Sequence, residues 1–217
     1  TLLFCLYIYK LKMNNIKIFE NDLPSDIDLS NEKVIGLDCE ALGLVVGRDP
    51  LTLVQLGLKS KEFYLIKLNR ETYKAPNLIK ILSNSSIQFI MHYARQDLLW
   101  LKYHLKVEPK NIFCTKLCSK IARTASSTHG YKDLVKELCG KDISKKEQQS
   151  DWGDPNLSEK QISYAAQDTQ YLFEIKDKLI KMLIREKRID LFEKCMKVLP
   201  VLVDMEISGY KISTFEH

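Results

Sequence analysis

Two acidic residues, Asp38 and Glu40, lie two positions apart in an otherwise apolar segment. Side chains alternate along a β-strand, so both carboxylates project from one face if this segment is extended. Leu37 and Cys39 then project from the other face. Neighbouring carboxylates repel each other, and a divalent cation would offset that repulsion because hard cations prefer oxygen ligands. For this pair alone, a solvated strand face is the competing explanation.

Two more carboxylates and a tyrosine follow along the chain. Asp97 lies near the start of an apolar-periodic segment, where the helix dipole favours a carboxylate whatever its role. Tyr164 and Asp168 are four residues apart in Tyr-Ala-Ala-Gln-Asp and share one face of a helix. The small side chains of Ala165 and Ala166 would let that helix approach a sheet or a substrate closely. In isolation, a surface acid and a core tyrosine are the simpler explanation of the pair.

The cysteines indicate neither a zinc site nor a disulfide framework. There is no Cys-x-x-Cys, and the four histidines do not interleave with cysteines at zinc-ligand spacing. Cys114 and Cys118 are four apart, which is typical of two small core residues on one helix face. Scattered cysteines in a domain of this size favour a reducing, intracellular compartment.

Composition excludes several classes of protein. The chain has 217 residues, of which 45% are hydrophobic and 28% charged, as in soluble globular domains and unlike disordered, collagenous or coiled-coil chains. No apolar run reaches the roughly 18 residues that a membrane-spanning helix needs. The net charge of +5 permits an anionic polymer as partner without requiring one.

The hydrophobic pattern predicts the elements that position these residues. Three successive strands read as an antiparallel meander, at 33–40, 51–58 and 62–68. A second set of segments alternates helix and strand, at 76–83 (helix), 87–92 (strand) and 94–105 (helix). Helices follow at 114–126 and 131–139, then a polar loop at 141–155 and a long helix from Ser158 to about 187. Ser158 with Gln161 forms a predicted capping box. We therefore expect an α/β protein with a mixed sheet surrounded by helices.

The beginning of the chain allows two interpretations. The sequence starts at Thr1, so we expect that it is part of something longer. Leu2 to Tyr9 is a short apolar run followed by Lys10 and Lys12, which fits either the end of a targeting segment or a buried strand.

Together, the acidic residues resemble the motifs of the DEDD superfamily of 3′–5′ exonucleases, in its tyrosine-containing, ribonuclease D-like branch. The three motifs appear in the family's order, as Leu-Asp-Cys-Glu-Ala, His-Tyr-Ala-Arg-Gln-Asp-Leu and Tyr-Ala-Ala-Gln-Asp-Thr. Gln149-Ser150-Asp151-Trp152 and the helix start at Leu157-Ser158 also look like ribonuclease D-type members. The resemblance covers roughly residues 16–185. It implies a ribonuclease H-like fold, an antiparallel three-strand meander plus parallel strands flanked by helices.

The resemblance also implies a two-metal phosphodiesterase. Asp38, Glu40 and Asp168 would hold one Mg²⁺ or Mn²⁺, and Asp38 would bridge to a second cation that Asp97 helps to hold. Tyr164 would orient the attacking water, since an unperturbed tyrosine pKa of about 10 suits orientation better than proton abstraction. The reaction would release nucleoside 5′-monophosphates from a single-stranded 3′ end.

Substrate contacts are expected around the first two motifs. Leu42 and Leu44 occupy the place where the family sets an apolar residue against the terminal base, with core packing as the alternative. His92, Tyr93, Arg95 and Gln96 precede Asp97 and are candidates for contacts to phosphate or sugar. Lys141, Lys145 and Lys146 form a basic loop that either follows a nucleic-acid backbone or is simply solvated.

The C-terminal segment resembles the connection between the exonuclease and polymerase domains of family A DNA polymerases. Pro200, Leu202, Met205, Glu206 and Gly209 match that pattern, and Ser213 departs from it. An amphipathic helix ended by Gly209 explains the periodicity by itself. The expected division is an N-terminal extension at 1–15, an exonuclease domain at 16–188 and the start of a connecting segment at 189–217.

Three functions remain in competition. The first is DNA proofreading, with a polymerase domain in the same longer chain, in a bacterial cytoplasm or a DNA-containing organelle. The second is a stand-alone, ribonuclease D-like enzyme that processes RNA 3′ ends. The third is a nucleic-acid-binding module without activity, which the presence of every metal-binding carboxylate disfavours.

Overall fold

The computed structural model describes residues 15–215. The apolar run at 2–9 lies outside the described residues, so both interpretations of it remain predictions. Within the described range, no helix is long and apolar enough to cross a membrane.

The centre of the molecule is one six-stranded mixed sheet with strand order β1-β4-β3-β2-β5-β6. The strands are β1 (Ile16–Glu20), β2 (Val34–Ala41), β3 (Leu51–Gly57), β4 (Phe63–Lys67), β5 (Gln88–Met91) and β6 (Ile112–Cys114). β2, β3 and β4 pair antiparallel, whereas β1 with β4, β2 with β5 and β5 with β6 pair parallel. The predicted α/β class, with its antiparallel meander and additional parallel strands, is confirmed.

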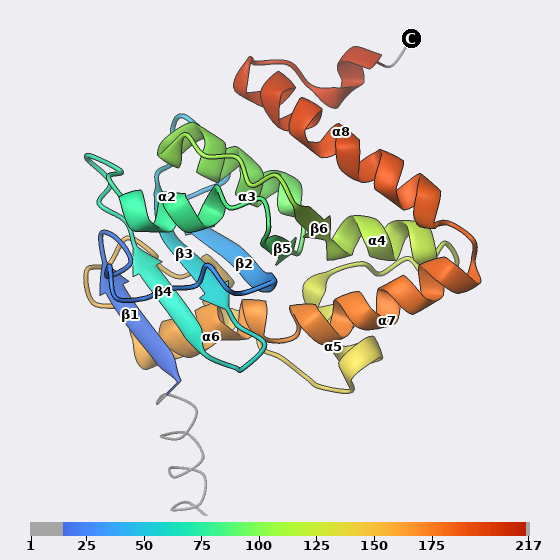
Figure 1. The fold of residues 1–217 in the computed structure, drawn as a ribbon, viewed down its shortest axis with the longest axis horizontal. Helices are drawn as coiled ribbons and strands as arrows, with labels where there is room; N and C mark the ends of the chain where they lie inside the picture. The colour runs from blue at the N-terminus through green and yellow to red at the C-terminus, as the bar shows by residue number, and fades with distance from the viewer. Residues whose placement is uncertain (1–14, 216–217) are drawn as a thin grey trace, which may run out of the picture.

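Helices cover both faces of this sheet (Figure 1). They are α2 (Pro76–Leu82), α3 (Ala94–Trp100), α4 (Thr115–Ala122), α5 (Tyr131–Cys139), α6 (Glu159–Gln170), α7 (Leu172–Arg185) and α8 (Ile189–Ile207). α2 and α3 pack on one face, while α6 and α7 pack on the other. α8 lies against α3 and α4, and its Leu199 and Val203 join the core cluster on the α3 side. The division at residue 188 remains a prediction.

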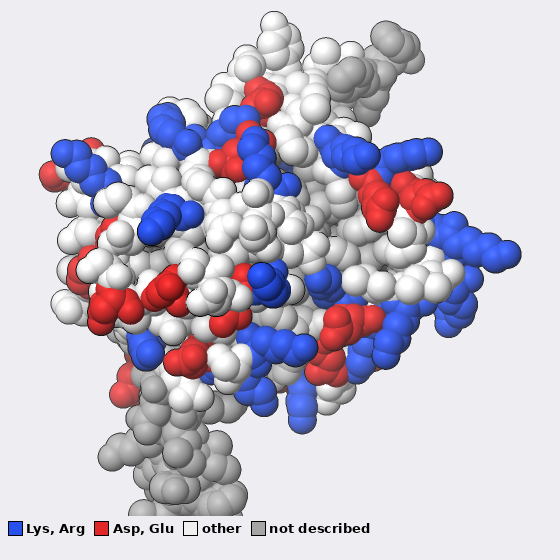
Figure 2. Space-filling view, viewed as in Figure 1, with Lys and Arg blue, Asp and Glu red and all other residues white. Residues whose placement is uncertain are grey.

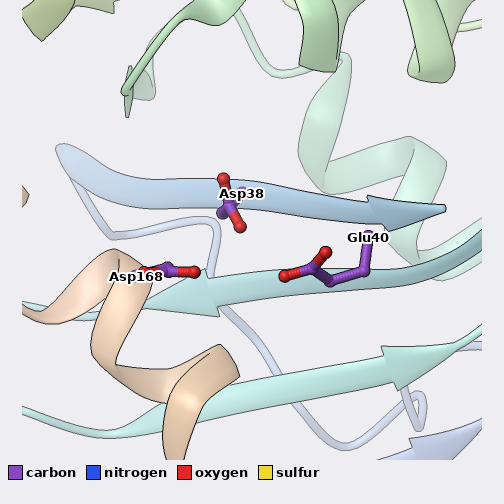
Figure 3. Close-up of side chains that lie close together, drawn as sticks. All are labelled: Asp38, Glu40 and Asp168. Carbon is purple, nitrogen blue, oxygen red and sulfur yellow. The ribbon is translucent and has the colours of Figure 1, made fainter. Parts of the chain in front are cut away.

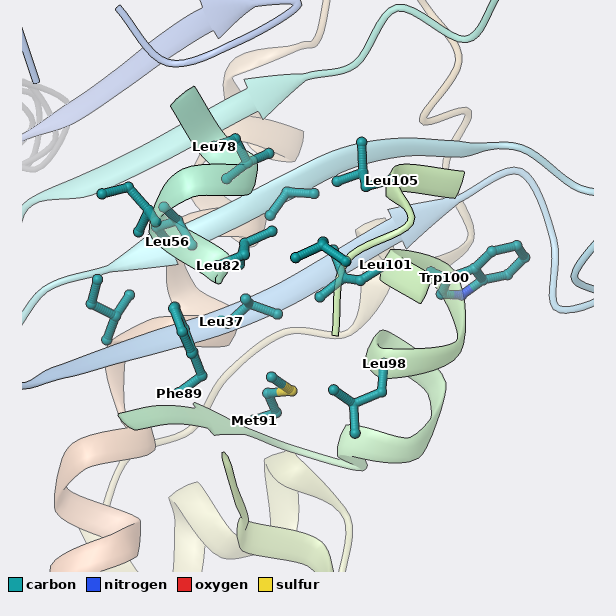
Figure 4. Packing of buried hydrophobic residues seen from close by; sticks show 14 of the residues in the cluster. Leu37, Leu56, Leu78, Leu82, Phe89, Met91, Leu98, Trp100, Leu101 and Leu105 are labelled. Carbon is teal, nitrogen blue, oxygen red and sulfur yellow. The ribbon is translucent and has the colours of Figure 1, made fainter. Parts of the chain in front are cut away.

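The two faces of β2 have opposite characters. Leu37 is fully buried and packs with Leu56, Phe89 and Met91 beneath α2 and α3 (Figure 4). The alternate residues of the strand, among them Asp38, project from the opposite face, toward α6. The apolar face therefore anchors the strand in the core and fixes the register that presents the acidic face.

A pair of glycines lets α6 approach this acidic face closely. Gly36 on β2 and Gly57 on β3 are cross-strand partners. A Cβ atom built on Gly57 would lie 2.4 Å from Oγ1 of Thr169, and one built on Gly36 would lie 3.1 Å from the Thr169 carbonyl oxygen. Thr169 packs against these two glycines and is fully buried. The neighbouring residue, Asp168, is thereby brought beside the two acidic residues of β2.

The sequence pattern missed two strands, β1 and β6. β1 lies before the first predicted strand, and only Ile16 and Phe19 of its five side chains are even half-buried. β1 is an edge strand that pairs parallel with β4, so its formation depends on a strand more than 40 residues away. β6 has three residues and forms the other edge of the sheet, where it pairs with β5. Such short edge strands carry too little periodicity to be recognised locally.

Several helix boundaries also differ from expectation. The helix predicted at 94–105 changes to a π-helical turn at Leu101–Leu105, and the one predicted at 114–126 ends at Ala122. The capping box of Ser158 and Gln161 is present. The long helix predicted from there to about 187 is wrong, because it breaks at Tyr171 into α6 and α7. The break coincides with a tertiary contact, in which the Tyr131 hydroxyl bonds to backbone groups of this turn.

Basic and acidic side chains are mixed over the face shown in Figure 2, with Lys and Arg densest toward the edge that carries α5 and α7. This distribution agrees with the small net charge of +5. Charge on the surface therefore permits contact with a polyanion but does not identify one.

The close contact between α6 and the Gly36–Gly57 pair can be tested by adding a side chain at one of these glycines. Gly57→Ala would place a methyl group 2.4 Å from Oγ1 of Thr169, so α6 must move away from the sheet. We expect the variant to lose about 1–3 kcal/mol of unfolding free energy, as overpacked cores do. Urea denaturation followed by circular dichroism measures this loss. Stability equal to that of the parent chain would contradict the close approach of α6.

Candidate active site

Three of the predicted site residues meet at one point. Carboxylate oxygens of Asp38, Glu40 and Asp168 all lie within 4.8 Å of one another. Two of these residues come from β2 and the third from the end of α6, and Figure 3 shows their side chains close together between strand and helix. Residues separated by about 130 positions in sequence thus form one half-buried acidic cluster.

Asp97 lies next to this cluster rather than within it. It belongs to the first turn of α3 and is 4% exposed. The helix begins after Tyr93, whose backbone adopts a left-handed conformation with φ of 66°. That turn takes the chain from β5 into α3, which contacts β2. Asp38 and Asp97 line the same cleft, and burial, followed by the charge of Asp38, raises the pKa of Asp97.

Burial and mutual repulsion make the charged cluster unfavourable. Burial raises the pKa of Asp38 to about 7. Burial, followed by the charges of neighbouring carboxylates, raises the pKa of Glu40 and of Asp168 above the usual range. Lys145 partly opposes the effect on Asp168. Fully ionised at neutral pH, these groups need compensating positive charge.

Tyr164 projects from α6 one turn before Asp168 and is buried. Its ring packs against Trp152 with ring centroids 5.9 Å apart. Burial, followed by the charges of Asp168 and Glu40, raises the pKa of Tyr164 above its usual value. The hydroxyl therefore stays protonated at neutral pH and serves as a hydrogen-bond donor beside the cluster.

The acidic cluster forms part of the wall of a cleft with a volume of about 960 Å³. All five residues of the predicted catalytic set line it: Asp38, Glu40, Asp97, Tyr164 and Asp168. A cleft of this size accommodates a small ligand or the end of a polymer.

Five of the six predicted substrate-contact residues also line the cleft: Leu42, Leu44, His92, Tyr93 and Gln96. Leu42 and Leu44 are exposed in the loop after β2, so they are not core residues. Arg95 is absent from the lining, because its guanidinium donates to Glu206 of α8 at 2.7 Å and to the Tyr93 hydroxyl at 2.9 Å. The role of each residue in binding remains a prediction.

His92 is held in one protonation state. Its Nδ1 lies 2.9 Å from Oγ1 of Thr115, and that hydroxyl donates to the carbonyl oxygen of Met91. When the Thr115 hydroxyl donates its one proton to Met91, Nδ1 of His92 donates to that hydroxyl, which leaves Nε2 as an acceptor. Burial, followed by the charges of Lys116 and Lys145, lowers the pKa of His92 to about 3. The ring is therefore neutral at physiological pH.

Tyr131 and Lys116 line the cleft without having been singled out from the sequence. No motif marks them, since Lys116 is one of many lysines and Tyr131 reads as the first residue of an amphipathic helix. The Lys116 ammonium lies 4.1 Å from the centroid of the Tyr93 ring, at the same wall of the cleft. Of the predicted basic loop, only Lys145 reaches the lining.

The donor set fits hard divalent cations. Three carboxylates converge within 4.8 Å, with a fourth acid buried beside them, and no thiol belongs to the converging group. Oxygen-only ligation is typical of Mg²⁺ and Mn²⁺. Asp38, Glu40 and Asp168 would hold one such ion, and Asp38 with Asp97 would hold a second.

The pH dependence of stability tests the charge imbalance. A carboxylate with a folded-state pKa near 7 and an unfolded value near 4 binds its proton more tightly when folded. Its stabilising effect is complete below pH 4 and is lost as the pH rises through 7. In EDTA, we therefore expect the unfolding free energy to fall between about pH 4 and 7, by an amount on the order of a few kcal/mol.

Thermal denaturation of the parent chain and of Asp38→Asn measures this effect. The variant carries no titrating group at this position, so its stability should fall less over the same range. Asp177→Asn, which changes an exposed carboxylate on α7, should behave like the parent chain. Equal slopes in all three proteins would contradict the assignment, whereas Mg²⁺ should stabilise the parent most at pH 8.

Comparison with known proteins identifies the family to which the chain is similar. A family model described as 3′–5′ exonuclease matches residues 20–184. Ribonuclease D of Xanthomonas oryzae is 32% identical over 169 residues, which are 78% of this chain and 46% of that protein. The chain thus spans about half the length of such curated relatives.

Solved structures cover the chain more fully. NrnC of Brucella melitensis has a TM-score of 0.86 and 37% identity, over 90% of this chain and 95% of that one. Another structure, described as NrnC with bound Mg²⁺, has a TM-score of 0.84 and 36% identity over 90% of this chain and 94% of that one. Together with the all-oxygen donor set, these similarities confirm divalent cations as the predicted cofactor class.

The match covers most of the chain, and the acidic motifs that suggested it lie together in one cleft. The chain therefore belongs to the 3′–5′ exonuclease family, in the ribonuclease D-like branch of the DEDD superfamily.

Proposed function

We propose that this protein is a 3′–5′ exoribonuclease that removes nucleoside 5′-monophosphates from short single-stranded RNA. The observation that carries the proposal is the convergence of Asp38, Glu40 and Asp168 beside a cleft with room for a chain end. The curated relatives named ribonuclease D support RNA as substrate. A structure described as NrnC bound to pGG supports a very short one, since this chain covers 94% of that protein with 37% identity.

The reaction is hydrolysis of the last phosphodiester bond. Water attacks the phosphorus atom, the bond from phosphorus to the 3′ oxygen of the penultimate nucleotide breaks, and that oxygen takes up a proton. Bound divalent cations supply positive charge that stabilises both the attacking and the leaving oxygen. Asp38, Glu40, Asp97 and Asp168 would hold these cations, whose positive charge would relieve the repulsion among the carboxylates.

Tyr164 has the role of a donor that orients the water. Its buried, protonated hydroxyl lies on the same face of α6 as Asp168. A tyrosine with a raised pKa is a poor base, so proton removal falls to a carboxylate such as Glu40. Tyr164 therefore contributes to the rate by positioning the nucleophile.

The walls of the cleft suit a short nucleotide chain. Leu42 and Tyr93 expose apolar and aromatic surface against which bases can stack. Lys116 and Lys145 supply positive charge for phosphates from the side of α4 and the loop before α6. His92 presents neutral Nε2 as an acceptor, which suits a hydroxyl donor such as the ribose 2′-OH, the group that distinguishes RNA from DNA.

DNA proofreading in a family A polymerase is the competing function. It rests on the pattern from Pro200 to Gly209, which in the structure forms the second half of α8 and the turn after it. The curated relatives favour RNA instead. The bacterial cytoplasm or a DNA-containing organelle remains the predicted location.

Degradation of matched substrates tests the proposal. Short 5′-labelled and 3′-labelled RNA and DNA strands, including a 5′-phosphorylated dinucleotide, are incubated with the protein and Mg²⁺. We expect RNA to shorten from its 3′ end, with the dinucleotide cleaved, and EDTA to stop the reaction. Preference for DNA would favour proofreading, and binding without cleavage would favour the non-catalytic module.

Asp38→Ala and Asp168→Ala should each abolish this cleavage, because each removes a ligand from the cation-binding cluster. Both should remain folded, since the loss of a repelling carboxylate does not remove core contacts. Full activity in either variant would overturn the metal assignment. Circular dichroism verifies the fold, and Asp177→Asn serves as the control with an exposed carboxylate changed.

Tyr164→Phe separates orientation from metal binding. The variant keeps the ring that packs on Trp152 and loses only the hydroxyl. We expect kcat to fall on the order of 100-fold, as misplaced reactants typically cause, with little change in Mn²⁺ affinity. Single-turnover kinetics and calorimetric titration with Mn²⁺ measure the two quantities. An unchanged rate would remove the orienting role.

A further inference from the structure

The break between α6 and α7 has a definite cause in the side chain of Tyr131. The Tyr131 hydroxyl donates to the carbonyl oxygen of Gln167 at 2.8 Å. The same hydroxyl accepts from the backbone amide of Tyr171 at 3.2 Å. In a regular α-helix these two backbone groups, four residues apart, would bond each other directly. The hydroxyl is thus inserted into the hydrogen-bond ladder, which is a known cause of helix breaks.

Asp168 lies inside the interrupted turn, directly after Gln167. The following residue, Thr169, is pressed against the Gly36–Gly57 pair of the sheet. The turn is therefore held on one side by the sheet and on the other by Tyr131. With both contacts in place, the Asp168 carboxylate lies within 4.8 Å of those of Asp38 and Glu40.

Tyr131 itself is firmly held. It is the first residue of α5 and is 9% exposed, and its ring lies 5.6 Å from that of His92, centroid to centroid. It lines the same cleft as the acidic cluster. Burial, followed by the charge of Asp168, raises the pKa of Tyr131, so its hydroxyl stays protonated and can donate.

We propose that Tyr131 is a positioning residue for the active site, whose hydroxyl sets the turn that aims Asp168 at the metal-binding carboxylates of β2. The hydroxyl acts through the helix backbone and not through contact with the substrate. Without it, the Tyr171 amide either bonds the Gln167 carbonyl directly or keeps only its contact with the Thr169 carbonyl, and the Gln167 carbonyl then loses its donor. Either change rotates the turn that carries Asp168. The inference rests on the proposed metal-binding role of Asp168.

The test is Mn²⁺ binding to the whole chain, measured by electron paramagnetic resonance without nucleic acid. Tyr131→Phe removes the hydroxyl and keeps the ring against His92. We expect the Mn²⁺ dissociation constant to rise on the order of tenfold, as loss of a supporting residue around a metal site typically causes. In the activity assay, high Mn²⁺ should restore most of the lost rate.

Tyr73→Phe is the matched control. Its hydroxyl also donates to a backbone carbonyl, that of Leu51 at 3.1 Å, and Tyr73 does not line the cleft. Tyr131→Phe loses two hydrogen bonds and Tyr73→Phe loses one, so the melting temperature should fall in both variants. Only Tyr131→Phe should weaken Mn²⁺ binding.

The possible failures are distinguishable. Equal Mn²⁺ affinity in the parent chain and Tyr131→Phe would overturn the positioning role, whatever the change in stability. Equal weakening in Tyr73→Phe would also overturn it, because the effect would then reflect general destabilisation. A parent chain that binds Mn²⁺ but shortens no oligonucleotide would instead refute the proposed function and leave the positioning role standing.

Discussion

Mutual repulsion among buried carboxylates is the constraint on which the rest of this structure depends. Asp38, Glu40 and Asp168 are held within 4.8 Å of one another, with Asp97 buried beside them. Such a group is unfavourable in the absence of cations, as the raised pKa of each member indicates. The fold must therefore supply the free energy that holds the group together, and the same repulsion becomes the driving force for binding Mg²⁺ or Mn²⁺.

The fold supplies that free energy through the apolar side of the same strand. Leu37 alternates with Asp38 and is fully buried among the leucines beneath α2 and α3. A shift of register by one residue would expose this apolar face and bury the acids in the core, so the hydrophobic effect fixes which side faces the cleft. Metal binding and core packing are thus coupled in one strand.

The helix side of the site is fixed by shape and by hydrogen bonds. The Gly36–Gly57 pair has no side chains, and Thr169 fills that space. Tyr131 then terminates α6 at the turn that carries Asp168. Because the sheet and α5 hold this turn from opposite sides, the position of the third carboxylate is set before any cation binds. Such preorganisation reduces the free energy needed to assemble the site.

The sequence by itself determined the chemistry and the main elements. The two-residue spacing of Asp38 and Glu40, the four-residue spacing of Tyr164 and Asp168, and the local capping signal at Ser158 depend only on strand and helix periodicity. Family motifs added the order and the likeness to an exonuclease. Only the tertiary structure decided the remainder. β1 and β6 exist through pairing with distant strands, and Arg95 is turned from the cleft by Glu206. The long helix breaks because a hydroxyl 36 residues away enters its ladder. Contacts of this kind join residues far apart in the chain, and no local pattern of apolar and polar residues encodes them.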